Sequence, residues 1–299
     1  MPEFERPGMV TDALAKDVDG DGLPDLLLAI EYGPLKLLRN TGGWKFADAT
    51  ADAGLAKLSG WWMSLAAADV DGDGDVDFAA GNQGLNTKYH PTEEKPQLCF
   101  YGDFDGSGGA QIVEAKTSAA GLLPVRGRSC SSQAMPFLRS KFSTFHAFAS
   151  ASLEEIYPPG KLSASLRLEA TVTASGLLLN DGKGRFEFHE LPRMAQISPA
   201  RAMVFFHADG DGKLDLFMAQ NFFSPQRETG RMDGGLGLLM PGDGKGGFTP
   251  VRPDRSGIVV ARDMADVIAA DMNGDQRPDL IIATNDGPVF VFTARPAGK

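Results

Sequence analysis

The chain has 299 residues and a formal net charge of −10, from 39 acidic and 29 basic side chains. Binding of nucleic acid requires clustered lysine and arginine, so this balance excludes a nucleic-acid partner. No apolar run reaches the 18 or so residues of a membrane-spanning helix. At this length an all-β chain often forms a single domain, here expected to cover residues 1–299.

The first notable stretch is the acidic loop at residues 17–25, between predicted strands at 11–15 and 26–30. Its carboxylates stand at relative positions 1, 3, 5 and 9, and glycines stand at positions 4 and 6. Calcium takes six to eight oxygen ligands, which a tight loop supplies from alternate side chains. Glycine permits the bend because it reaches positive φ without a Cβ penalty. A single copy is also compatible with a polar hairpin turn.

The same pattern returns along the chain. Residues 69–77 match it at every position, and residues 271–279 keep oxygen-bearing side chains at positions 1, 3, 5 and 9. Residues 207–215 begin with His207, and residues 103–111 lack the acidic ninth residue. An EF-hand would require glutamate at position 12 and flanking helices. These loops have apolar strands on both sides, so we interpret the three intact copies as calcium loops between strands.

Repeated DxDxDGxxD loops that lead into a short apolar strand resemble the FG-GAP or VCBS repeats of integrin-α-type β-propellers, especially those of bacterial extracellular proteins. The resemblance implies Ca²⁺ bound between the first two strands of a blade, with the residue at position 7 offering its backbone carbonyl. The metal-ligating candidates are Asp17, Asp19, Asp21, Leu23, Asp25, Asp69, Asp71, Asp73, Asp75, Asp77, Asp209, Asp211, Lys213, Asp215, Asp271, Asn273, Asp275, Arg277 and Asp279. Imidazole is a poor calcium ligand, so His207 predicts weak or no binding in its loop.

Four strands within about 45 residues are typical of a propeller blade. The expected fold is therefore all-β, a β-propeller of about five four-stranded blades with a mainly helical insertion near residues 117–175. The expected blades cover residues 10–50, 61–116, 171–191, 202–252 and 264–293, and the insertion covers 117–170.

Ring closure is assigned to the N-terminus. The last blade lacks an outer strand, and residues 1–8 imitate the outer strand at 248–253. We expect Phe4 to lie antiparallel to residues 289–292, because an unpaired apolar edge invites aggregation.

The insertion holds the candidate residues for a ligand or partner. Phe145, Phe148, Ser152 and Ile156 repeat at helical spacing, and a second helix is expected over residues 161–170. The insertion either packs over one face of the ring or acts as a lid or partner-binding element, since long insertions are often functional. The candidates for ligand contact are Arg126, Arg128 and Gln133 of the insertion, together with Arg231 in a second polar segment at residues 222–231.

The favoured function is a calcium-binding extracellular module for binding, adhesion or scaffolding. Its partner would be an extracellular protein or a polysaccharide, and the chain would be a monomer or part of a longer chain. Weakly binding calcium modules suit extracellular, cell-surface or periplasmic locations. The first residues do not form a signal peptide, so a processed or excised chain is expected. No hydrolase motif is recognised, but a carbohydrate-active lyase or hydrolase with a site in the central depression is the alternative.

Overall fold

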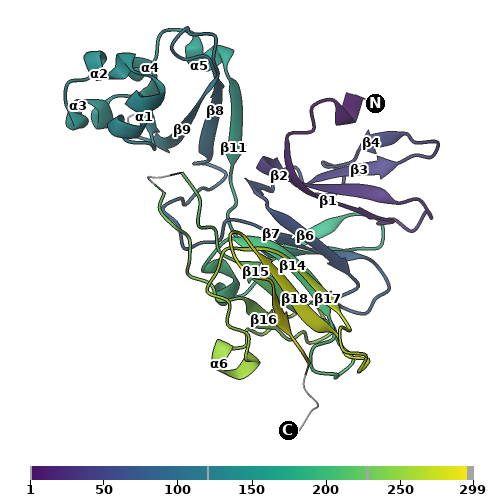
Figure 1. Ribbon diagram of the computed structural model, residues 1–299. Helices are drawn as coiled ribbons and strands as arrows, with labels where there is room; N and C mark the ends of the chain where they lie inside the picture. Colours follow the sequence, from purple (N-terminus) through teal and green to yellow (C-terminus); the bar gives the residue numbers. More distant parts are fainter. Residues whose placement is uncertain (1, 120, 227–228, 295–299) are drawn as a thin grey trace. The chain divides into compact units, whose positions relative to one another are not determined.

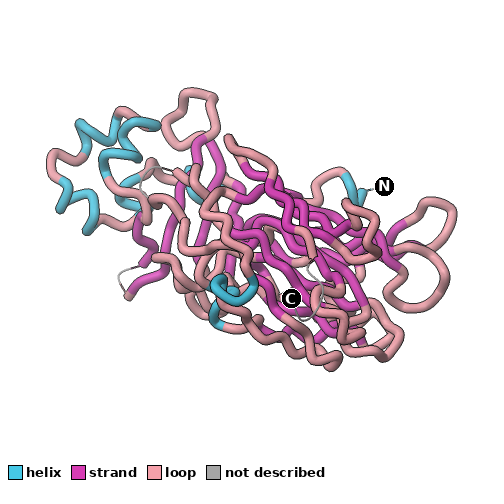
Figure 2. Tube along the Cα trace, turned by 60° about the horizontal axis from the view of Figure 1, so that its bottom comes forward, coloured by secondary structure: helices cyan, strands magenta, loops and turns pink. Residues whose placement is uncertain are grey.

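The structure is a computed structural model that describes residues 2–119, 121–226 and 229–294. It is an all-β protein with several antiparallel sheets and short helices (Figure 1, Figure 2). The chain divides into two compact units. Unit 1 comprises residues 1–88, 173–225 and 230–299, and unit 2 comprises residues 89–172 and 226–229.

Unit 1 contains four sheets. Sheet 1 consists of β1 (Met9–Lys16), β2 (Asp25–Pro34), β3 (Lys36–Asn40) and β4 (Phe46–Asp48), with β5 (Ser59–Trp61) also paired to β2. Sheet 2 consists of β6 (Ser64–Ala68), β7 (Asp77–Gly81), β12 (Gly176–Asn180) and β13 (Phe186–Glu190). Sheet 3 consists of β14 (Ala200–Phe206), β15 (Asp215–Gln220) and β16 (Leu238–Met240). Sheet 4 consists of β17 (Met264–Ala270), β18 (Asp279–Thr284) and β19 (Phe290–Phe292).

The first strands of these sheets are neighbours in the order β1, β6, β14 and β17. The second strands are the most apolar, and every residue of β7 and β15 is buried. One core cluster joins sheets 2 and 3 through side chains such as Leu177 and Met218, and another joins sheets 3 and 4 through Phe217 and Ile282. Burying such side chains supplies about 1.5–3 kcal/mol each, so these two clusters hold sheets 2, 3 and 4 together.

The pairing of β7 corrects the expected blade boundaries. Residues 61–116 were expected in one blade and 171–191 in another. Instead β7 pairs with β12, with Phe78 opposite Leu178 and Ala79 opposite Leu177. Unit 2 therefore enters the chain between the second and third strands of sheet 2. The local sequence pattern does not reveal whether β8 or β12 pairs with β7, because both are apolar strands that can form the same backbone hydrogen bonds.

Unit 2 is a sheet covered by helices, whereas a mainly helical insertion was expected. Its strands follow the order β10 (Gly121–Pro124), β9 (Gln111–Ser118), β8 (Gln97–Gly102) and β11 (Leu166–Ala170). Its helices are α1 (Arg128–Ala134), α2 (Phe137–Lys141), α3 (Phe145–Ser150), α4 (Leu153–Ile156) and α5 (Lys161–Ala164). The helix expected over 161–170 ends early, and its second half is strand β11. Residues 140–156 are likewise broken, because Thr144 and Ser152 cap new helices.

The N-terminus does not close a ring. Residues Pro2–Phe4 form the short 3-10 helix η1, and β19 pairs with β18. The Phe4 ring packs edge-on against Phe46, with 5.3 Å between centroids. Proline cannot donate a ladder hydrogen bond, and Pro2 and Pro7 bracket the segment that was expected to pair. The expected strand is therefore wrong for residues 2–8, and Met1 lies outside the described residues.

Two short elements complete the fold, η2 (Arg193–Gln196) and α6 (Pro253–Ser256). Among the described residues, no helix is long and apolar enough to cross a membrane.

Candidate functional site

The five acidic loops connect antiparallel strands in one shared register. In each, the residue before position 1 pairs with position 9: Lys16 with Asp25, Ala68 with Asp77, Gly102 with Gln111, Phe206 with Asp215, and Ala270 with Asp279. Four of the loops lie in unit 1, after β1, β6, β14 and β17, and the fifth lies in unit 2, after β8. The loop at residues 103–111, which lacks the acidic ninth residue, occupies the same position in its own hairpin as the other four.

The aspartate at position 1 organises each intact loop. Asp17 accepts hydrogen bonds from the backbone N–H of Gly20 at 2.9 Å and of Gly22 at 2.8 Å. Asp69 and Asp271 accept equivalent bonds from their own positions 4 and 6. These bonds satisfy the backbone of a tight turn and hold the carboxylate over the loop.

Position 6 has a left-handed backbone in each intact loop. Glycine fills it at Gly22 and Gly74, with φ of +85° and +96°. In the loop at 271–279 the residue is Gln276, with φ of +64°. A side chain in this conformation costs roughly 1–2 kcal/mol relative to a right-handed one.

Two loops gather carboxylates closely enough to share a cation. In one, Asp17, Asp19 and Asp21 offer oxygens within 4.8 Å of one another. In the other, Asp69, Asp71 and Asp77 do the same. A donor set made only of carboxylate oxygens fits calcium, a hard cation with oxygen ligands.

The aspartate at position 9 has a structural role that sequence reasoning missed. Both of its oxygens accept buried or partly buried backbone N–H groups. Asp77 accepts from Val70 at 3.0 Å and from Asn180 at 2.9 Å. The same double acceptance is made by Asp25, Asp215 and Asp279. The position-9 carboxylate therefore fastens the loop to the third strand, or to the segment that follows it.

Burial raises the pKa of these carboxyls. For Asp77 burial is the largest cause and nearby Asp71 and Asp73 add to it, so its pKa rises to about 6 although two N–H groups oppose the shift. Burial likewise raises the pKa of Asp25 and Asp215. A cation beside such groups would favour their charged form.

In the loop at 207–215, side chains of the loop itself contact the groups that would otherwise bind a cation. The Nδ1 atom of His207 lies 2.6 Å from the backbone oxygen of Lys213. That oxygen is the position-7 carbonyl, and a carbonyl only accepts, so Nδ1 carries the proton. The Lys213 ammonium also lies 3.5 Å from an oxygen of Asp211. These contacts engage two of the expected ligand groups.

The loop at 103–111 is neutralised by its own unit. Gln111 Oε1 accepts from Phe104 N at 2.7 Å, as a position-9 aspartate would, and its Nε2 donates to Asp105 at 3.0 Å. The Lys161 ammonium lies 3.4 Å from Asp103, the position-1 residue. The Gln111 amide thus takes the place of the position-9 carboxylate, and the Lys161 ammonium takes the place of the cation. Gln111 was visible in the sequence as a signal of this change.

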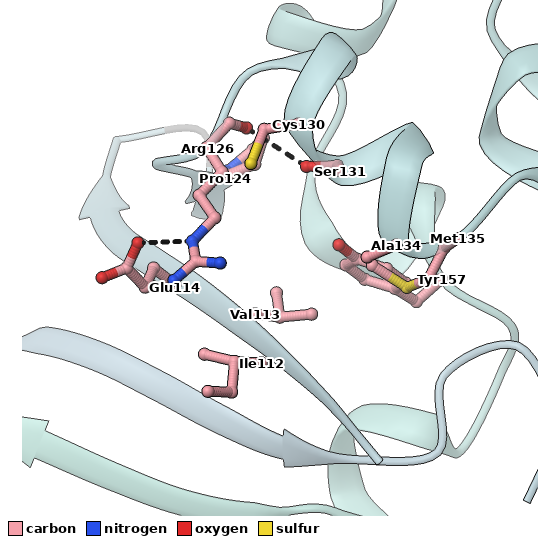
Figure 3. Close-up of a pocket in the computed structure, with 10 residues that line it drawn as sticks. All are labelled: Ile112, Val113, Glu114, Pro124, Arg126, Cys130, Ser131, Ala134, Met135 and Tyr157. Carbon is pink, nitrogen blue, oxygen red and sulfur yellow. Dashed lines mark hydrogen bonds and ion pairs between the residues drawn. The ribbon is translucent and has the colours of Figure 1, made fainter. Parts of the chain in front are cut away.

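Of the four residues predicted to contact a ligand, Arg126 lines a pocket of unit 2 of about 50 Å³ (Figure 3). Its Nε donates to Glu114 at 2.8 Å. Burial and the Glu114 charge raise the pKa of Tyr89, which contacts Glu114, to about 12. Ser131 and Tyr157 line the same pocket.

The other three predicted ligand residues have different surroundings. Arg128 donates to the carbonyl of Phe142 at 2.6 Å, Gln133 is exposed, and Arg231 stacks 3.8 Å above the Phe223 ring in unit 1. Within unit 2, Arg128 and Gln133 are absent from the Arg126 pocket.

Comparison with known proteins defines the class. The model of the FG-GAP-like repeat family matches residues 17–80 and 208–282, so the chain carries FG-GAP-like repeats in these two segments. This confirms the resemblance seen in the sequence. No curated protein sequence matches the chain.

Two solved structures are similar over nearly the whole chain. One is the Vibrio cholerae biofilm matrix protein Bap1, with 11% identity and a TM-score of 0.32, covering 97% of this chain and 64% of that chain. The other is a chain in the crystal structure of BBS1N in complex with ARL6DN, with 12% identity and a TM-score of 0.27, covering 97% of this chain and 94% of that one. The chain thus spans less than two thirds of the Bap1 chain.

Proposed function

We propose that this chain is a calcium-stabilised extracellular binding module that attaches to another extracellular protein or to a polysaccharide. The observation that carries the proposal is the pair of carboxylate clusters at Asp17, Asp19 and Asp21 and at Asp69, Asp71 and Asp77. The FG-GAP-like repeats at residues 17–80 and 208–282 support an adhesion-type role. The sheets of unit 1 would then be propeller blades, because their first strands lie side by side in chain order.

Calcium would act on this protein through stability. A ligand that binds only the folded state stabilises it by about 2.7 kcal/mol per site at a hundredfold excess over Kd. The intact loops are the sites, including the one at 271–279. The loops at 207–215 and 103–111 would bind calcium weakly or not at all, because His207 and Lys161 contact the groups that would face the ion.

Calcium titration of the purified chain by calorimetry tests the proposal. We expect binding that falls by about one site in each of the Asp19→Ala and Asp71→Ala variants. Asp52→Ala is the matched control, since Asp52 is exposed and lies outside every loop. Absence of heat and of any rise in melting temperature on adding calcium would refute the proposed metal role.

A further inference from the structure

Unit 1 contains a second candidate site, away from the acidic loops and built from equivalent positions of the four repeats. The residues five before loop position 1 are Asp12, Ser64, Ala202 and Asp266, and those six before it are Thr11, Met63, Arg201 and Ala265. All eight line one cavity of about 220 Å³. They come from β1, β6, β14 and β17 or from the residue immediately before β6, so the cavity lies where the first strands meet.

Bulges aim these side chains. The strand register shifts between Val10 and Asp12, between Ala200 and Ala202, and between Met264 and Asp266. A bulge re-aims a side chain and is common beside binding sites. Three of the four first strands therefore carry the same irregularity at the cavity wall.

The carboxylates of the cavity keep acceptor capacity. Asp12 accepts Ala13 N at 2.8 Å through one oxygen and Leu65 N at 2.7 Å through the other. Among the described residues, Asp266 accepts a hydrogen bond from Val267 N at 2.8 Å through Oδ1, and its Oδ2 accepts none. A carboxylate has about four lone-pair sites, so both groups can accept further hydroxyl donors.

Arg201 brings unused donors to the same cavity. Among the described residues its Nε is buried without a hydrogen-bond partner, and its guanidinium lies 5.0 Å from the centroid of the Phe222 ring. Within the described part of the chain it forms no ion pair with Asp12 or Asp266, although all three line one space. A buried donor without a partner is unfavourable, so a ligand that accepts hydrogen bonds from the Arg201 guanidinium would be favoured in this cavity.

The chemistry of the lining selects the ligand. An anion would meet two carboxylates, and a metal cation would meet the guanidinium of Arg201. A neutral molecule with several hydroxyl groups can donate to Asp12 and Asp266 and accept from Arg201 at once. The volume lies below the roughly 300–1,000 Å³ of pockets for drug-sized ligands, so the cavity suits one ring rather than a chain.

We propose that this cavity binds a single neutral sugar ring through Asp12, Asp266 and Arg201. The inference rests on the proposed binding function and gives that function a ligand class. It does not depend on calcium occupancy, because the cavity residues lie five or six positions before each loop.

Saturation-transfer NMR and calorimetry on the full chain test this site, with the methyl α-glycosides of glucose, galactose and mannose as probes. We expect binding of at least one probe, with at least tenfold loss of affinity in Arg201→Met and in Asp266→Asn. The matched controls are Arg262→Met and Asp52→Asn, which change exposed residues outside the cavity. Both controls should bind as the unaltered chain does.

Calcium titration of every variant separates this inference from the proposed metal role. Arg201→Met should keep the calcium binding of the unaltered chain while losing the sugar. If no probe binds to a chain that is folded and binds calcium, the cavity proposal is overturned and the metal proposal stands. Sugar binding that survives in both Arg201→Met and Asp266→Asn, or that acetate displaces competitively, also overturns it.

Discussion

The position-9 aspartate offers the sharpest test of how the loops are held, and Asp77→Ala is the variant of choice. Asp77 is 1% exposed and accepts two buried N–H groups, those of Val70 and Asn180. The alanine variant leaves both donors without this acceptor. The matched control is Asp71→Ala at position 3, because within the described part of the chain Asp71 accepts a single long backbone bond, from Asp73 N at 3.4 Å.

The expected cost follows from the two donors. Each buried N–H without a partner costs about 1–3 kcal/mol. Removing a buried carboxylate of raised pKa returns part of that cost, since its desolvation penalty disappears. We therefore expect Asp77→Ala to lose about 2–4 kcal/mol in chelator, a fall of about 5–15 °C in melting temperature. Asp71→Ala should lose little free energy of unfolding in chelator, and most of its loss of stability should appear only in calcium.

Tryptophan fluorescence during urea and thermal unfolding measures this cost in unit 1, because all three tryptophans, Trp44, Trp61 and Trp62, lie there. Each variant is unfolded in chelator and in calcium. Equal stability of Asp77→Ala and the unaltered chain in chelator would refute the structural role. Equal losses for both variants in chelator would refute the distinction between positions 9 and 3.

Three further outcomes are expected. Gln276→Gly should raise the free energy of unfolding in chelator by roughly 1 kcal/mol, because glycine relieves the left-handed backbone; an unchanged or lower value contradicts this. The pKa of Asp77 rises from 3.8 to about 6 in the fold, so the folded state binds this proton more tightly than the unfolded chain does. The contribution of Asp77 to the stability of the metal-free protein should therefore fall as pH rises from about 4 to about 6. Denaturant curves at each pH measure this loss, which Asp77→Ala should reduce. The double variant Gln111→Asp with Lys161→Ala should gain a calcium site in unit 2, measured by titration. The single variant Lys161→Ala should bind calcium at this loop more weakly than the double variant does.

The sequence by itself determined the repeat and its local chemistry. Spacing of Asp and Gly over nine residues is a local property, so it predicts a hairpin loop, its flanking strands and the FG-GAP-like family. The departure of the loop at 207–215 from the repeat pattern was also readable from local sequence. Its first residue, His207, contacts the carbonyl of Lys213 within the same loop.

Tertiary structure alone decided which strands share a sheet. The pairing of β7 with β12 spans residues 89–172 of unit 2, and no nearby residue encodes a contact between such distant segments. The same holds for Lys161, which lies 58 positions from the Asp103 it neutralises. The cavity of Arg201 and Asp266 was also invisible in the sequence, because its members are scattered over four strands and meet only where those strands pack side by side.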